Sequence, residues 1–199
     1  SDVHGKNHHL HGCFSECVES LELLLADGSQ VQCSRTEQPE LFHATCGGMG
    51  LIGLIVAATL RLLRIESAYI QQTTFKAANL DEALQLFETH STSTYSVAWI
   101  DCLAKGHALG RSLLMVGEHA RDGQLLLPAK RSLSVPLDMP AALLNRYSVQ
   151  AFNELYYQRI RKPESKQRVT FESFFYPLDG IQQWNRLYGK QGFVQYQFV

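Results

Sequence analysis

The sequence contains little of what marks several common protein classes. Its 199 residues carry 18 Lys and Arg against 19 Asp and Glu, a net charge of -1, so neither a basic surface for nucleic acid nor an acidic tail is predicted. The longest apolar runs, LELLLA and GLIGLIVAATL, are shorter than the roughly 20 residues of a membrane span. The composition therefore predicts a globular chain with no nucleic-acid partner and no transmembrane segment.

Cysteine is also sparse, and it follows no metal or redox pattern. The five cysteines are odd in number and form no CxxC pair. Their spacing favours reduced, mostly buried thiols. The five are Cys13, Cys17, Cys33, Cys46 and Cys102.

Histidine, in contrast, is concentrated at the start, in SDVHGKNHHLHGCF. Gly5 and the lack of apolar periodicity argue against a helix there. A zinc site is not predicted, because no acids or cysteines stand at familiar ligand spacings. The residue types leave two alternatives: a solvated surface loop, or a loop whose backbone approaches a cofactor at Gly5 while Lys6 and the histidines donate hydrogen bonds.

Both ends of the chain lead us to expect an internal segment of a longer protein. The start is rich in functional residue types with no element before it. The end, GFVQYQFV, alternates like a strand and stops without a turn.

The first third of the chain predicts a hairpin, a short helix and a further strand. Asp27-Gly28 is a strong turn signal, and Pro39 suits the first turn of a helix. The glycine-rich CGGMGLIG then permits close backbone approach. The predicted elements are the hairpin CVESLELLLADGSQVQCS, the helix PELFHAT and a mostly buried strand, LIVAATLRLLRI.

From about residue 68 the pattern is β-α-β-β, then helices, then β-α-β. Asn79 can cap the helix NLDEALQLFETH, with Glu82 three residues later. Direct β-β connections favour an antiparallel sheet with helices on one face, an α+β layer. The later predicted elements are the strands YIQQTTF, TYSVAWID, GRSLLMVGEH, RVTFESFFY and GFVQYQFV, and the helices PAALLNRYSVQAFNELYYQRI (broken near Tyr147) and LDGIQQWNRLYG.

Several of these stretches resemble one family over nearly the whole chain. DVHGKNHHLHGCF, LLLADGSQ and ELFHATCGGMGLIGLIVAATL are similar to FAD-linked oxidases of the vanillyl-alcohol-oxidase superfamily. SVAWID, NELYYQRI, FFYPLDGIQQWNRLYG and GFVQYQFV continue the resemblance. It implies an α+β fold in which residues 1–67 form the C-terminal part of an FAD-binding domain and residues 68–199 a substrate-binding domain truncated at its C-terminus.

The resemblance also assigns candidate site residues. It implies that Ser1, Asp2, Val3, His4 and Ile55 bind FAD. It places the substrate at His4, Lys6, Trp99, Phe175 (or its neighbour Tyr176), Gln195 and Gln197. From the residues alone, Ile55 and Trp99 are equally well explained as core positions.

The implied activity is oxidation of a secondary alcohol of a sugar by hydride transfer to the flavin, with the protein positioning both. The implied substrate is a lipid-phosphate-linked pentose such as decaprenylphosphoryl ribose. A short-chain reductase partner would complete the epimerisation, a step of cell-wall biosynthesis. We expect a cytoplasmic or membrane-associated location and an inactive isolated segment. The alternatives are a sugar-1,4-lactone oxidase and a binding module that has lost its flavin.

The alternation of GFVQYQFV generates a first prediction. Gln195 and Gln197 lie on one face of the predicted strand and Tyr196 on the other. In the full-length protein, Gln197→Ala should lower kcat/KM more than thermal stability, because an amide facing substrate leaves a polar partner unsatisfied at a cost of roughly 1–3 kcal/mol. Tyr196→Ala is the control. Early melting of Gln197→Ala with normal specific activity at low temperature would assign the strand to the scaffold.

Overall fold

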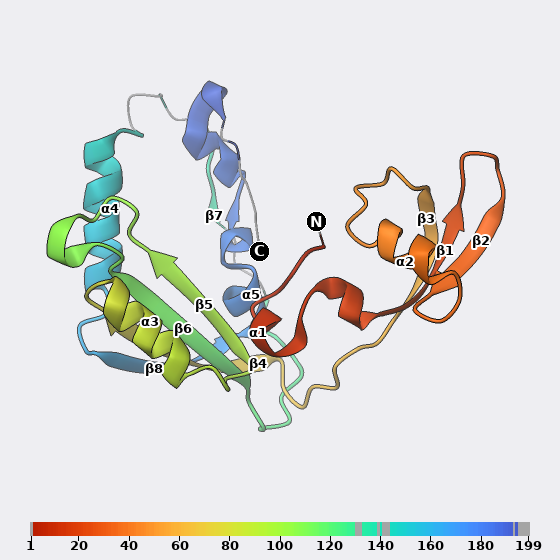
Figure 1. Cartoon of the computed structure of the whole chain (residues 1–199). Coiled ribbons are helices and arrows are strands. Elements are labelled where there is room, and N and C mark those ends of the chain that lie inside the picture. Colours follow the sequence, from red (N-terminus) through yellow and green to blue (C-terminus); the bar gives the residue numbers. More distant parts are fainter. Residues whose placement is uncertain (1, 130–132, 139, 141–143, 193, 195–199) are drawn as a thin grey trace. The chain divides into compact units, whose positions relative to one another are not determined.

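The computed structural model describes residues 2–129, 133–138, 140, 144–192 and 194 (Figure 1). The chain forms two compact units, divided between Arg64 and Ile65. All strand pairings within the described residues are antiparallel except for one two-residue pair, so the predicted α+β class is confirmed.

The first unit is built on the predicted hairpin. Strands β1 (Val18–Leu24) and β2 (Gln30–Ser34) pair antiparallel, and β3 (Leu54–Leu60) pairs with the other edge of β1. Gly28 takes a φ of 84°, which glycine reaches without steric cost, and the Asp27 carboxylate accepts hydrogen bonds from the Ser29 amide and hydroxyl.

Helix α2 (Pro39–Thr45) also forms where it was predicted and contributes the buried Phe42. Before β1, one turn of helix, α1 (His8–His11), and the 3-10 turn η1 (Phe14–Cys17) appear in a stretch expected to be a loop. Backbone hydrogen bonds close this turn without any apolar periodicity: the His8 amide donates to the Gly5 carbonyl, and the Leu10 and His11 amides donate to the Asn7 carbonyl. The core of the unit consists of Val18, Leu21, Leu23, Cys33 and Phe42.

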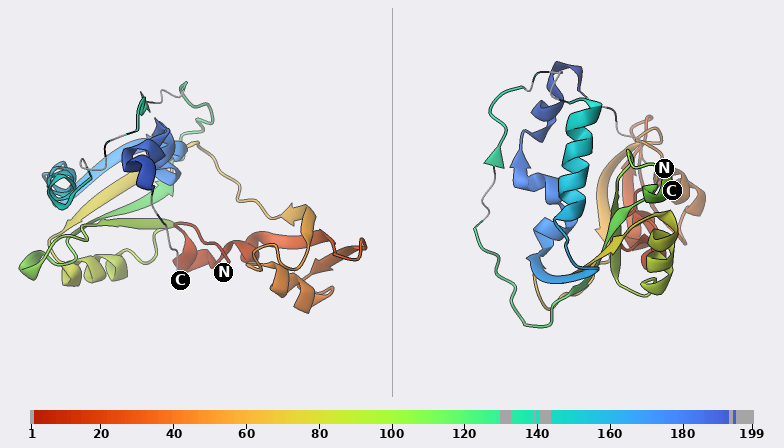
Figure 2. Two further views of the ribbon diagram at one scale, coloured as in Figure 1. Left: turned by 90° about the horizontal axis from the view of Figure 1, so that it is seen from above. Right: turned by 90° about the vertical axis from the view of Figure 1, so that its left-hand side faces the viewer.

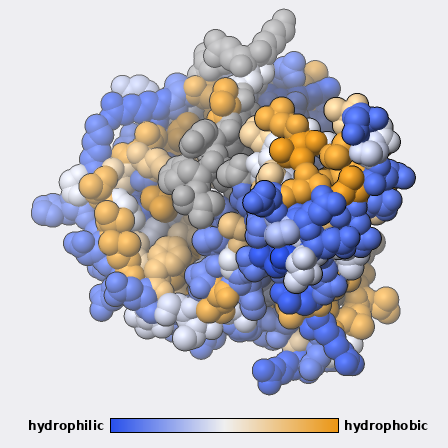
Figure 3. All heavy atoms as spheres, turned by 45° about the vertical axis from the view of Figure 1, so that its right-hand side comes forward, coloured by the Kyte–Doolittle hydropathy of each residue, from blue (hydrophilic) through white to orange (hydrophobic). Residues whose placement is uncertain are grey.

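The expectation that the third strand is mostly buried was wrong. All seven residues of β3 are exposed. Among the described residues, β3 is an edge strand that pairs with β1 alone, and none of its residues belongs to the buried core described for this unit. An apolar run therefore predicts the strand but not what covers it. Figure 3 shows hydrophobic residues gathered in patches at the surface of the face that it draws.

The second unit is a four-stranded antiparallel sheet with the order β5-β6-β4-β8. Three strands form where they were predicted: β4 (Tyr69–Ala77), β5 (Tyr95–Ile100) and β6 (Ser112–His119). The fourth, β8 (Glu164–Thr170), begins four residues earlier than the predicted strand RVTFESFFY and shares only residues 168–170 with it. Helix α3 (Leu80–Thr89) begins at Asn79, whose side chain accepts the Glu82 amide at 2.9 Å, as the sequence predicts.

Helices cover both faces of this sheet rather than one, which corrects the expectation (Figure 2, left). On one face, Phe75 of β4 stacks on His90 just after α3, with ring centroids 4.1 Å apart. On the other, α5 (Phe171–Phe175) packs Phe174 against Ile70. The pattern of elements cannot predict this, since a helix after a strand can return on either face of the sheet.

Two predicted elements near the end of the chain have a different form. Residues 171–175 are the helix α5 rather than the end of a strand, because the Thr170 hydroxyl accepts the Ser173 amide as a helix cap. The predicted helix over 178–189 is replaced by short segments: η4 (Pro177–Gly180), β9 (Ile181–Gln182), which pairs in parallel with β7 (Leu133–Ser134), and η5 (Trp184–Gln191). The predicted strand GFVQYQFV, with Gln195 and Gln197, lies outside the described residues except for Gly192 and Val194.

Helix α4 (Arg146–Gln158) begins one residue before Tyr147, near which the predicted helical stretch was expected to break: Asn145 is extended, and its side chain accepts the amides of Tyr147 and Ser148 as a helix cap. An ion-pair network ties the helix to the sheet. Asp101, only 2 % exposed, accepts hydrogen bonds from Arg111 Nε and Nη2 at 2.8 and 2.6 Å and from Asn153 of α4 at 2.7 Å.

The same network reaches two further groups. The Leu103 amide donates to Asp101, and the second Nη atom of Arg111 lies 2.7 Å from the Glu154 carboxylate of α4. Burial by itself raises the pKa of the Asp101 carboxyl, but the hydrogen bonds from Arg111, Leu103 and Asn153 outweigh it and hold the pKa below its ordinary value.

The network generates a second prediction. Asp101→Asn should lower the free energy of unfolding at pH 7 by about 3 kcal/mol, because it leaves the Arg111 guanidinium without its buried partner. Asp122, which pairs with Arg168 at the surface, is the matched control, and Asp122→Asn should cost less than about 1 kcal/mol. Urea unfolding of the two variants beside the wild type measures both.

The contribution of Asp101 should also depend on pH. Because its folded-state pKa is lowered, the carboxylate stabilises the fold above the unfolded-state value of about 3.9, and this stabilisation is lost as the pH falls through the folded-state pKa. The difference between wild type and Asp101→Asn should therefore shrink as the pH is lowered from about 5. A difference that stays constant down to low pH would contradict this assignment.

Candidate functional site

The first unit contains an apolar hollow of about 350 Å³, a size within the range of small-molecule sites. Its walls come from the N-terminal segment, η1, β1, the glycine-rich loop after α2, and β3. The lining residues are Asp2, Val3, Phe14, Ser15, Val18, Leu21, Thr45, Cys46, Gly47, Met49, Ile55, Ala58 and Leu60.

The N-terminal segment is fixed along one wall by backbone pairing. The Phe14 amide donates to the Val3 carbonyl at 2.7 Å, and the Ser15 amide donates to the Asp2 carboxylate at 3.1 Å. His4 forms an isolated antiparallel bridge with Cys13. These contacts hold Asp2 and Val3 in place beside the hollow.

The loop after α2 forms another part of the wall and requires special backbone conformations. Gly47 lines the hollow with a φ of 79°. Gly48 leaves no room for a side chain, since a Cβ there would stand 2.3 Å from the Ala44 carbonyl oxygen. Met49 adopts a φ of 56°, unusual for a residue with a side chain, and is 86 % exposed. Such strain is typical of ligand-contacting segments.

Burial shifts the pKa of several titratable groups of this unit, among them the predicted site residue Lys6 and Cys46 of the hollow. Burial lowers the pKa of the Lys6 amine. Burial, and then the nearby Asp2 carboxylate, raise the pKa of the Cys46 thiol in the wall of the hollow. The lining of the hollow is mostly apolar and includes one carboxylate, that of Asp2. Such a lining suits a flat aromatic ring with a polar edge.

The structure brings together three of the five predicted cofactor residues. Asp2, Val3 and Ile55 share the hollow. His4 lies beside it, with its ring 4.9 Å from that of His8, and is not part of the lining. Ser1 lies outside the described residues. Phe14, Thr45, Cys46 and Met49 were not singled out from the sequence, and the left-handed loop conformation that places Met49 there has no signal beyond the surrounding glycines.

The histidine-rich start shows no metal-binding arrangement. Within the described part of the chain, no group of three or more histidine, cysteine, aspartate or glutamate side chains is placed to hold an ion. The rings of His4 and His8 contact each other, so two of the four clustered histidines meet.

In the second unit, Trp99 and Phe175 lie on the same face of the sheet. Trp99 contacts the ring of Tyr156 of α4 at 4.8 Å, and Phe175 meets the edge of Tyr95 at 4.8 Å. Tyr95 and Trp99 are both on β5 and four residues apart, so alternation turns them to one side. Phe175 is also packed against the buried cluster of this unit, so it has a structural role as well.

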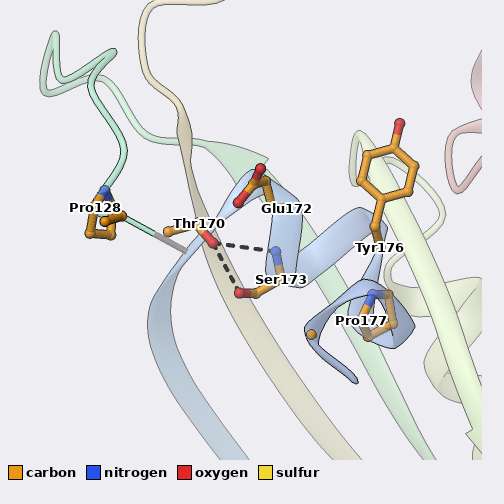
Figure 4. A pocket seen from close by; sticks show the side chains of 8 residues that line it. Pro128, Thr170, Glu172, Ser173, Tyr176 and Pro177 are labelled. Atoms are coloured by element: carbon orange, nitrogen blue, oxygen red, sulfur yellow. Dashed lines mark hydrogen bonds between the residues drawn. The ribbon is translucent and has the colours of Figure 1, made fainter. Parts of the chain in front are cut away.

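A second hollow, of about 290 Å³, lies at the start of α5 and is lined by Tyr176, the alternative to Phe175 as a predicted substrate residue (Figure 4). Its polar wall comes from the start of α5, where the Thr170 and Ser173 hydroxyls lie 2.9 Å apart. Glu172 and Tyr176 also line it, and in Figure 4 their side chains rise on the same side of the helix. Glu172 was not predicted as a site residue, because RVTFESFFY was interpreted as a strand; the available signal was Thr170 as a helix cap.

Comparison with known proteins supports the resemblance found in the sequence. The chain is 37% identical, over its whole length, to decaprenylphosphoryl-β-D-ribose oxidase of Mycolicibacterium smegmatis, and it covers 45% of that protein. The resemblance to FAD-linked oxidases is confirmed. A Streptomyces coelicolor protein described only as uncharacterized is 34% identical over 72% of the chain, which covers 41% of that relative.

More distant relatives are reductases. The human Delta(24)-sterol reductase is 29% identical over 55% of the chain, which covers 20% of that enzyme. No protein-family model matches the chain. The chain thus spans less than half the length of these curated relatives.

The hollow generates a third prediction, on thiol reactivity. Cys46 should react with iodoacetamide at pH 8 more than about tenfold more slowly than the exposed Cys102, because burial and the Asp2 carboxylate disfavour its thiolate. Asp2→Asn should accelerate alkylation of Cys46 and leave Cys102 unchanged. Mass spectrometry of the alkylated peptides against time gives both rates. Equal rates for the two thiols would show that Cys46 is not enclosed as the structure has it.

Proposed function

We propose that this chain is part of an FAD-dependent oxidoreductase that oxidises a secondary alcohol of a sugar. In this proposal, residues 1–67 form the C-terminal part of the FAD-binding domain and residues 68–199 the substrate-binding domain. The observation that carries it is the hollow of the first unit. The resemblance assigns Asp2, Val3 and Ile55 to the flavin. Asp2 and Val3 lie far from Ile55 in the sequence, yet all three line one apolar hollow.

The residues of the hollow fit a flavin ring. The aliphatic side chains of Val3, Met49 and Ile55 would pack against the ring and exclude water, while Asp2, held by the Ser15 amide, would accept hydrogen bonds from its polar groups. When bound, the flavin would supply the redox chemistry by accepting a hydride from the carbinol carbon. The part of the protein described here holds and orients the ring; His4 extends the same wall.

The substrate is proposed to be a lipid-phosphate-linked pentose, as the name of the mycobacterial relative indicates for that enzyme. Trp99 offers a broad aromatic face for the apolar side of a sugar ring, and Phe175 lies on the same sheet face. His4 and Lys6 would donate hydrogen bonds to sugar hydroxyl groups or phosphate. Gln195 and Gln197, outside the described residues, are proposed to complete the substrate contacts.

The product of such a reaction is a keto sugar, and a reductase must act on it if the overall change is an epimerisation. We propose a short-chain reductase as that partner. A substrate carried by a lipid also favours a membrane-associated location over a purely cytoplasmic one.

The fourth prediction tests the flavin site in the full-length protein. Ile55→Asp should lower the flavin content of the purified protein more than about tenfold, because it places a charge against the apolar ring face. Leu51→Asp, at an exposed position outside the hollow, should retain flavin. Flavin absorbance relative to protein measures this. Full flavin content in Ile55→Asp, or a wild-type protein without flavin, would overturn the proposal.

The flavin-containing full-length protein can also be used to distinguish between the two candidate substrates. Reduction of the flavin under anaerobic conditions should follow addition of a polyprenyl-phosphate ribose and not of an aldono-1,4-lactone. Trp99→Ala should raise KM for the lipid-linked sugar while flavin content stays normal. Reduction by the lactone alone would identify a sugar-lactone oxidase instead.

A further inference from the structure

Helix α4 leaves a row of apolar side chains on its outward face. Tyr147, Phe152 and Leu155 are 82 %, 58 % and 75 % exposed, and Ala151 lies between them. Tyr147, Ala151 and Leu155 are spaced four residues apart and therefore share one face. We call Tyr147, Ala151, Phe152 and Leu155 the α4 stripe. The buried side of the helix is opposite, at Asn153 and Tyr157, and Figure 2 (right) looks onto this helix.

Cations border the α4 stripe at both ends. Arg146 is the first residue of the helix, Arg159 follows its last, and Arg161 and Lys162 lie just beyond; all four are exposed. The Glu154 carboxylate does not cancel them, because it is already paired with Arg111 at 2.7 Å. The stripe is therefore an apolar surface within a positive rim.

Helix α3 provides the contrast on the opposite face of the sheet. Its Leu80 and Leu84 are also exposed, but their neighbours Asp81, Glu82 and Glu88 are acidic. Both helices thus expose apolar side chains, but with neighbours of opposite charge. A negatively charged surface would attract α4 and repel α3.

We propose that the α4 stripe docks on an anionic lipid surface. The apolar side chains would enter the headgroup boundary while Arg146, Arg159, Arg161 and Lys162 meet lipid phosphates, the arrangement by which amphipathic helices lie on a bilayer. Within the described residues, no helix combines the length and apolarity needed to cross a bilayer. Docking requires neither flavin nor sugar, so it stands apart from the proposed function. It would, however, bring the second unit to the bilayer in which a lipid-linked sugar resides.

Vesicle co-sedimentation of the full chain tests the proposal. The chain should bind vesicles of phosphatidylcholine mixed with phosphatidylglycerol, bind vesicles of phosphatidylcholine alone much more weakly, and lose binding as salt is raised. Leu155→Glu should weaken binding by about tenfold. Leu84→Glu, at a comparably exposed leucine of α3, should leave it unchanged. Replacing Arg161 and Lys162 together by glutamine should weaken binding by more than about tenfold.

For each variant, circular dichroism shows whether the chain is folded, and sedimentation without vesicles shows whether it aggregates. These two controls distinguish unfolding and aggregation from a loss of vesicle binding. Absence of wild-type binding to the anionic vesicles would overturn the proposal, and so would equal binding to neutral vesicles or an equal effect of Leu84→Glu. Self-association in the absence of lipid that Leu155→Glu abolishes would assign the α4 stripe to contact with a second copy instead.

Discussion

The buried Asp101–Arg111 pair is the constraint on which the second unit depends. A carboxylate that is almost fully enclosed is costly, and it is stable here because the Arg111 guanidinium, the Leu103 amide and the Asn153 side chain all donate to it. Through Asn153, and through Glu154 on Arg111, the pair fixes α4 against the sheet. The position of Tyr156 beside Trp99, and the outward direction of the α4 stripe, follow from that attachment.

Aromatic contacts also stabilise the sheet face that carries the proposed substrate residues Trp99 and Phe175. Arg111 also lies over the ring of Tyr157, 4.8 Å from its centroid, and the Tyr157 hydroxyl donates to the Ala77 carbonyl. The Arg111 guanidinium, the Tyr157 side chain and the Ala77 carbonyl are therefore in contact at one end of the sheet. At the other end, Gly117 leaves the space in which Phe174 packs, since a Cβ there would stand 2.7 Å from that ring. One face of the sheet is held at both ends and carries Trp99 and Phe175 between them.

The first unit is organised on a different principle. Its core is small, and β3 contributes exposed rather than buried side chains. Backbone geometry shapes the hollow of this unit, through the hydrogen bond between Val3 and Phe14 and the left-handed conformations of Gly47 and Met49. A thin sheet with an open apolar hollow is suited to packing against a flat ring, whose faces would then provide the burial that the strand lacks.

Local signals in the sequence determined much of the secondary structure. The Asp27-Gly28 turn, Pro39 at the start of α2 and the Asn79 cap of α3 act within a few residues, so their outcome could be predicted. The α+β class was also predicted correctly, from the order of the elements along the chain. The resemblance named Asp2, Val3 and Ile55 as cofactor residues, but only the fold brings them to one hollow. The exposure of β3, the helix at 171–175 and the placement of α3 and α5 on opposite faces were decided by tertiary structure. They depend on which surfaces meet across long stretches of chain, and periodicity records only that a surface is apolar. The enclosure of Cys46 beside Asp2 was decided in the same way, because the distance between two residues 44 positions apart is set by the fold and not by their order in the chain.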